Sequence, residues 1–169
     1  MGAIELVQFR EATPEREAEV ARVMAECPDY YQAVQGRLAG PEEVRGFFHA
    51  EVPGIPPEDV RSYGIYSQGR LVGLASMVLG WKRPGQSMIG FLAVPERERG
   101  HGYARAACCA LEAIARASPH GTSMRIGIVE TNANAFGFWR HLGFVETGER
   151  KALEEFTADV ILLEKPLHG

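Results

Sequence analysis

The segment from Leu92 to Ala104 constrains the fold most, because an apolar run breaks there into a glycine-containing loop and continues as an Ala-rich amphipathic helix. The first amides of such a helix lack intrahelical partners, and the positive end of the helix dipole points at the loop. Gly100 and Gly102 carry no side chain and let an anion approach the backbone closely. Positive charge beside the loop comes from three arginines, Arg97, Arg99 and Arg105. The segment is therefore typical of a phosphate-binding loop.

Two common phosphate-binding patterns do not match this loop. The dinucleotide-binding spacing G-x-G-x-x-G fails because Arg105 stands where the third glycine belongs, and the G-K-S/T ending of a P-loop is absent. The alternative that remains open on this segment alone is a loop that only turns a strand into a helix.

Hydrophobic periodicity and turn residues predict the order of elements along the chain. The first half is expected to hold a strand at residues 4–9, helices at 14–25, 30–38 and 41–50, and strands at 63–67, 71–79 and 88–94. The second half is expected to hold a helix at 102–117, a strand at 124–129, a helix at 134–141 and strands at 144–149 and 159–163. Thr13 is the expected N-cap of the first helix, Pro28 closes it, and Gln68-Gly69 forms a hairpin turn. The order β-ααα-βββ-α-β-α-ββ predicts an α/β (α+β) fold with a mixed, mostly antiparallel sheet of about seven strands and helices on both faces.

Length and charge narrow the class of protein. A chain of 169 residues with 46% hydrophobic residues suits one domain, here residues 1–169. The formal charge of −4 gives no general basic field, so we expect neither nucleic acid nor a membrane as partner. The N-terminal residues lack the order of a signal peptide, and a cytoplasmic protein is expected. The three cysteines, Cys27, Cys108 and Cys109, are expected to be core thiols, and no metal site is expected.

Two motifs together resemble the GCN5-related N-acetyltransferase (GNAT) family. The first is Arg99-x-x-Gly102-x-Ala104, which begins five residues beyond Val94. The second is Asn132-x-x-Ala135-x-x-Phe138-Trp139-x-x-Leu142-Gly143-Phe144, which follows the strand expected to end near Val129. Their mutual spacing and the predicted order of elements both agree with the fold of that family.

The resemblance implies a site for acetyl-CoA. The backbone of Leu92, Ala93 and Val94 would bind the pantetheine arm as an adjoining strand does, in a gap where the strands at 88–94 and 124–129 splay apart, often with a bulge. The pyrophosphate would be held by the amides of Arg99, Gly100, His101, Gly102, Tyr103 and Ala104. Asn132 would bond the pantetheine from the far side, while Phe138 and Trp139 would pack near the thiol end; Asn132 could also serve as a helix N-cap.

The implied activity is that of an acetyl-CoA-dependent N-acyltransferase that moves an acetyl group to a primary amine of a small molecule, or to a protein amine, by direct attack on the thioester. The alternative is a non-catalytic GNAT-like module that binds CoA or an acyl-CoA. This chain has Trp139 where many relatives have a Tyr acid, and Met88 where some have a Glu base. We therefore assign no catalytic acid or base.

Three further residues are candidates on the substrate side. Glu130, just past a central strand, is a candidate to attract an amine or guide a water. Tyr30 and Tyr31 belong to the helical lobe that lines the acceptor pocket in the family, and packing is the alternative role for both. Dimers are common in the family, and the C-terminal strand is expected to support a homodimer by edge pairing.

Overall fold

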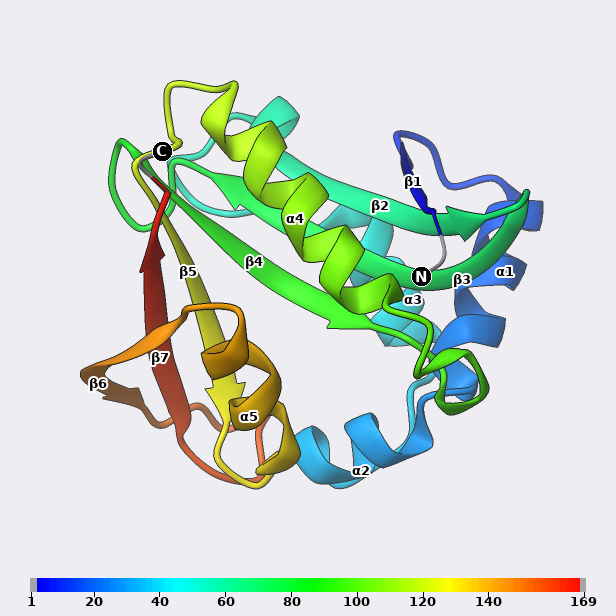
Figure 1. Cartoon of the computed structure of the whole chain (residues 1–169). Coiled ribbons are helices and arrows are strands. Elements are labelled where there is room, and N and C mark those ends of the chain that lie inside the picture. Colours follow the sequence, from blue (N-terminus) through cyan, green and yellow to red (C-terminus); the bar gives the residue numbers. More distant parts are fainter. Residues whose placement is uncertain (1–2, 168–169) are drawn as a thin grey trace.

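Seven strands form one mixed sheet in the order β1-β2-β3-β4-β5-β7-β6 (Figure 1). The computed structural model describes residues 3–167. The strands are β1 Glu5–Gln8, β2 Val60–Ser67, β3 Arg70–Leu79, β4 Gln86–Ala93, β5 Ser123–Val129, β6 Val145–Lys151 and β7 Val160–Pro166. Among these described strands, the β4–β5 pair alone is parallel, and every other neighbouring pair is antiparallel. The predicted mixed, mostly antiparallel sheet is confirmed.

Helices cover both faces of this sheet, as predicted. They are α1 Pro14–Ala25, α2 Pro28–Gln35, α3 Pro41–His49, α4 Tyr103–Arg116 and α5 Asn134–His141. Buried residues of α4 and Trp139 of α5 share one hydrophobic cluster with β2 to β5 and β7. Buried residues of α1, α2 and α3 form a second cluster with Leu71, Leu74 and Ala93. Figure 1 shows the same division, with α4 in front of the sheet and α1 and α3 behind it.

The start of α2 differs from its prediction. Thr13 caps α1 as expected, since its hydroxyl accepts a hydrogen bond from the Arg16 amide at 3.2 Å. Pro28, however, opens α2 instead of only closing α1, and α2 ends at Gln35 with Gly36 at φ 73°. Proline has no amide hydrogen to lose in a first helical turn, so the same residue fits a helix start.

For one of the three cysteines, the sequence predicted the wrong degree of burial. Cys27 and Cys108 are fully buried, whereas Cys109 is exposed. The buried stripe of α4 runs through Cys108, Leu111 and Ala115, and the next residue along a helix points about 100° away from such a stripe. The prediction of a core thiol at Cys109 is therefore wrong.

The last strand does not lie at an edge of the sheet. β7 lies between β5 and β6, and the edge strands are β1 and β6. The expectation that the C-terminal strand offers a free edge to a second copy is therefore wrong. Within residues 3–167, no helix combines the length and the apolar character that crossing a membrane requires.

Candidate active site

The parallel ladder between β4 and β5 is short. It joins four residue pairs, from Gln86 with Ser123 to Ile89 with Ile126. Both strands continue beyond the last pair, β4 to Ala93 and β5 to Val129, without pairing with each other. The opposite edge of β4 stays paired with β3 as far as Ala93. Residues 90–93 therefore present one strand edge that no strand of the sheet occupies.

A β-bulge marks the point where the two strands separate. Ser76 of β3 faces Phe91 while the next residue, Met77, faces Ile89, so Gly90 is the extra residue of β4. A Cβ at Gly90 would lie 3.1 Å from the Ser76 hydroxyl oxygen, which leaves little room for a side chain. A bulge bends its strand and increases the local twist, so the divergence of β4 from β5 has a local cause.

The loop after β4 leads into α4 with its amides free. Gly100 has φ 86° and Gly102, the N-cap of α4, has φ 80°, both in the left-handed region that favours glycine. The first hydrogen bond of the helix runs from the Ala106 amide to the Gly102 carbonyl at 3.0 Å. Among the described residues, no acceptor is bonded to the amides from Gly100 to Arg105. The loop therefore presents a run of unbonded amides at the start of α4.

Arg99 holds this loop in place. Its Nε donates to the Val94 carbonyl at 2.9 Å, and its two terminal nitrogens donate to the Asp29 carboxylate at 2.9 and 3.3 Å. Its amide donates to the Glu96 carbonyl at 3.1 Å. The hydrogen bonds from Arg99 hold the pKa of Asp29 below its usual value. Arg99 thus ties the end of β4 to the start of α2, and its amide, which was predicted to bind the pyrophosphate, is already bonded to Glu96.

Two further contacts brace the loop. The His101 ring stacks on Tyr103, with centroids 5.3 Å apart, and its Nδ1 lies 3.0 Å from the Glu98 carbonyl. Glu98 is 5% exposed and pairs with Arg70 at the start of β3. The sequence did not predict the ion pairs of Arg70 with Glu98 and of Arg99 with Asp29. These partners are 28 and 70 positions apart, and no local pattern connects residues so distant.

The second motif lies on the β5 side of the gap. The Asn132 amide donates to the Val129 carbonyl at 2.8 Å, while its side chain makes no hydrogen bond to a described residue. Ala133, not Asn132, is the N-cap of α5. Trp139 is buried, with its ring 5.0 Å from that of Phe138 and 5.2 Å from that of Phe144. Trp139 thus belongs to the core, and the Asn132 amide group remains available.

A pocket of about 350 Å³ lies on the face opposite α4. It contains both tyrosines predicted for the acceptor side, Tyr30 and Tyr31, and it reaches Gly90 and Phe91 of β4. Its lining comes from α1 to α3, β2 to β4 and two loops: Met24, Tyr30, Tyr31, Val34, Gln35, Glu43, Gly46, Phe47, Ala50, Val52, Val60, Arg61, Ser62, Ser76, Met77, Val78, Gly90, Phe91 and Phe156. The pocket therefore meets β4 where its ladder with β5 has ended.

Glu43 is the carboxylate among these lining residues. It accepts hydrogen bonds from the Gly40 amide at 2.6 Å and from Arg37 at 3.0 Å. Burial acts to raise the pKa of Glu43, but the Gly40 amide and Arg37 outweigh it and leave that pKa lowered. Burial raises the pKa of Tyr30 to about 12 and also raises that of Tyr31. Glu43 thus stays ionised and both tyrosines stay protonated near neutral pH.

Glu130 and Met88 lie apart from this pocket's lining. The Glu130 carboxylate accepts from Arg150 at 2.8 Å and its side chain is 51% exposed. The Met88 side chain lies over Gly127 of β5, 3.8 Å from where a Cβ would stand. Within residues 3–167, no group of three His, Cys, Asp or Glu side chains is arranged to hold a metal ion.

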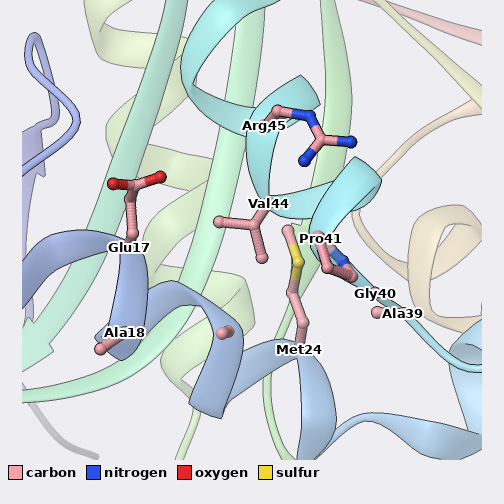
Figure 2. A pocket seen from close by; sticks show the side chains of 9 residues that line it. Glu17, Ala18, Met24, Ala39, Gly40, Pro41, Val44 and Arg45 are labelled. Carbon is pink, nitrogen blue, oxygen red and sulfur yellow. The ribbon is translucent and has the colours of Figure 1, made fainter. Parts of the chain in front are cut away.

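A second pocket, of about 400 Å³, lies between α1 and α3 (Figure 2). Met24 of α1 extends toward Val44 of α3, and Glu17 and Arg45 stand at its margins. Its lining holds Glu17, Ala18, Ala21, Met24, Ala39, Gly40, Pro41, Val44 and Arg45. It is the larger of the two but includes no residue of β4 or of the glycine loop, which is the segment from Gly100 to Arg105, so the smaller pocket is the candidate acceptor site.

Known proteins share both the sequence pattern and the fold. The Acetyltransferase (GNAT) family model matches residues 18–144. No curated protein has a significant match to the chain. Among solved structures, an acetyltransferase from Thermus thermophilus has a TM-score of 0.73 at 21% identity, covering 98% of this chain and 99% of the other. The ribosomal-protein-S18-alanine N-acetyltransferase from Escherichia coli has a TM-score of 0.68 at 12% identity, covering 99% and 96%.

A third solved structure carries a ligand. A GNAT family acetyltransferase from Elizabethkingia anophelis with acetyl-CoA bound has a TM-score of 0.62 at 14% identity, covering 96% of this chain and 97% of the other. These identities are low, so the structures establish a shared fold, whereas the family match spans most of the sequence. The chain belongs to the GNAT acetyltransferase family.

Proposed function

We propose that this chain transfers the acetyl group of acetyl-CoA to the primary amine of a small molecule. One observation carries the proposal: the free edge of β4 at residues 90–93 connects two sites of different chemistry. At its end, the loop from Gly100 to Arg105 presents unbonded amides, which suit a pyrophosphate. At its start, Gly90 and Phe91 border a pocket on the opposite face of the sheet.

The residues around the edge fit the cosubstrate. The amides of Gly100 to Ala104 would hold the pyrophosphate, and the backbone of Leu92 to Val94 would bond the pantetheine arm. Asn132, whose side-chain amide has no bond among the described residues, would reach that arm from the β5 side, next to Phe138 and Trp139. Acetyl-CoA supplies the activated acetyl group. The acetyl-CoA-bound relative from Elizabethkingia anophelis supports this choice of cosubstrate.

The acceptor amine would enter from the pocket that Tyr30 and Tyr31 line. An amine attacks a thioester only as the neutral base, and holding it close to the carbonyl supplies much of the rate. The side chains that line the pocket offer no group that changes charge near neutral pH. The amine would therefore lose its proton to solvent, and the pocket would act by orienting it.

Thermal unfolding with ligands tests the cosubstrate. Acetyl-CoA at about 100 times its dissociation constant is expected to add about 2.7 kcal/mol to the stability of the folded chain, whereas NAD and ATP are expected to add little. Gly102→Glu places a carboxylate at the anion site and is expected to abolish the effect. Gly102→Ala is the matched control, because it introduces the same strain at φ 80° without the charge.

Release of free CoA thiol then tests transfer. A panel of primary amines is expected to accelerate release in the wild type and not in Gly102→Glu. No stabilisation by acetyl-CoA or CoA at millimolar concentration would contradict the proposal. Stabilisation without amine-dependent thiol release would reduce the role of the chain to binding.

A further inference from the structure

The pocket bordered by Gly90 has aromatic walls from several elements. The Tyr30 ring packs edge-on against Phe91 with centroids 5.6 Å apart, and Phe47 packs against the same Phe91 at 6.2 Å. Phe156, from the segment between β6 and β7, lines another side. Aromatic walls of this kind stabilise a bound ligand, because binding removes apolar surface of the ligand from water.

The size of the pocket limits the body of its ligand. A cavity of about 150 Å³ is enough to hold benzene in a protein interior. The pocket here measures about 350 Å³. It therefore has room for one ring and a short arm that reaches β4, while a folded polypeptide would have to insert a single side chain.

The charges around the pocket disfavour a polycation. Glu43 is already bonded to the Gly40 amide and to Arg37, so its charge is compensated. Arg61, which also lines the pocket, donates from Nε to the Glu58 carbonyl and pairs with no carboxylate among the described residues. A second ammonium group in this pocket would lose its hydration without gaining a free carboxylate.

Gly46 keeps part of this space open. Glu43, Gly46, Phe47 and Ala50 follow the spacing of one helical face, and all four line the pocket. A Cβ at Gly46 would meet no atom within 4 Å. Glycine inside a helix is less stable than alanine, so the stability of α3 does not explain this residue, and the space beside Gly46 is open toward the pocket.

We infer that the acceptor is a monoamine with an aromatic or branched apolar body, and that Gly46 makes room for that body. The inference rests on the proposed acetyl transfer and names the substrate class for the same site. The single amine would lie toward Gly90 and the apolar body against Phe91, Phe47 and the open face of Gly46.

Acetylation rates of four acceptors test the substrate class. The acceptors are 2-phenylethylamine, ethylamine, spermidine and a short lysine-containing peptide. We expect kcat/KM for 2-phenylethylamine to exceed that for each of the others by at least about tenfold, since a hydrophobic pocket discriminates strongly by the apolar surface it buries. A preference for spermidine or for the peptide would overturn the inference.

Two substitutions at Gly46 test the role of this residue. Gly46→Phe fills the space, so kcat/KM for 2-phenylethylamine should fall at least about tenfold while that for ethylamine changes less than about twofold. Gly46→Ala adds only one methyl group to the same space, so kcat/KM for 2-phenylethylamine should fall by less in this variant than in Gly46→Phe. Equal losses for both amines in Gly46→Phe would overturn the role of Gly46. Should Gly46→Phe fold poorly, Gly46→Leu replaces it with the same expectations.

Acetyl-CoA binding separates failure of this inference from failure of the proposed function. Calorimetric titration with acetyl-CoA should give the same affinity in wild type and in Gly46→Phe, because Gly46 lies on the face opposite α4. N-acetyl-2-phenylethylamine should bind the wild type and bind Gly46→Phe at least about tenfold more weakly. If acetyl-CoA binds but only polycations are acetylated, this inference alone fails. If acetyl-CoA does not bind, the proposed function fails as well.

Discussion

Glu43, Tyr30 and Tyr31 each keep one protonation state through the neutral range. Glu43 has a lowered pKa and is ionised, and burial raises the pKa of Tyr30 to about 12, so it stays protonated. We therefore expect log kcat/KM for 2-phenylethylamine to rise with a slope of about one between about pH 6 and pH 9, because only the amine itself titrates. The measurement is a pH series of initial rates at saturating acetyl-CoA.

Glu130→Gln is the control for this pH profile. The Glu130 carboxylate is half exposed and bound to Arg150, so its loss is expected to change the rate less than about threefold. A plateau in the profile near neutral pH that disappears in Glu130→Gln would contradict this expectation and identify Glu130 as the base.

Residues of the glycine loop were predictable from the sequence because their signal is local. A strand, Gly100, Gly102 and the start of a helix follow one another within a few positions, and the structure has that geometry. Other contacts depend on how distant elements pack. Examples are the ion pair of Arg99 with Asp29 and the pocket that both Phe156 and Gly90 line. One sequence carries no pattern for such contacts.

Helix α4 is fixed to β7 by a buried carboxylate. Glu112 is 4% exposed, and both its oxygens accept from the Lys165 ammonium at 3.0 Å, while Arg116 lies 3.5 Å away. Lys165→Met leaves this buried charge with Arg116 and with the Cys108 thiol, which donates to it at 3.4 Å, so the free energy of unfolding is expected to fall by about 3 kcal/mol. Urea denaturation at neutral pH measures the change.

Arg140→Met is the matched control for this prediction. Its ion pair with Glu146 is exposed on both sides, so its loss is expected to cost less than about 1 kcal/mol. Equal effects of the two substitutions would mean that Glu112 does not depend on Lys165.

Most elements were predicted within a few residues, and the exceptions have physical causes. The hairpin of β2 and β3 was predicted correctly from the polar pair Gln68-Gly69. In the structure both residues adopt the positive φ that such a turn needs. α2 was displaced because proline serves equally at a helix end and at a first turn. The place of β7 between β5 and β6 was not predictable, because the order of strands in a sheet depends on tertiary packing.

In residues 3–167, the two larger hydrophobic clusters lie on opposite faces of the sheet, and each contains one buried cysteine. Cys108 lies in the cluster under α4 and Cys27 in the cluster under α1 to α3, while Cys109 is exposed. Burial raises the pKa of Cys27 to about 11 and also raises that of Cys108. A disulfide reagent is expected to label one thiol of the native chain quickly and all three after unfolding in urea.

Cys109→Ser is the control for the labelling experiment. It should remove the fast phase and leave the two slow thiols, which also gives a chain suited to assays that read free CoA thiol. Rapid labelling of two thiols in the native wild type would contradict the burial of either Cys27 or Cys108. The relative rates of Cys27 and Cys108 then report whether the two faces open together or separately.

The short β4–β5 ladder also bears on the synthesis of the chain. During synthesis, β4 and α4 leave the ribosome before β5. Until β5 has been made, β4 therefore lacks its parallel partner. A waiting strand edge invites pairing with another nascent chain, and bulges are a common means of preventing it. The bulge at Gly90 interrupts the regular edge in the middle of β4. The bulge that accompanies the open edge of β4 in the finished protein is therefore expected to limit aggregation before the sheet is complete as well.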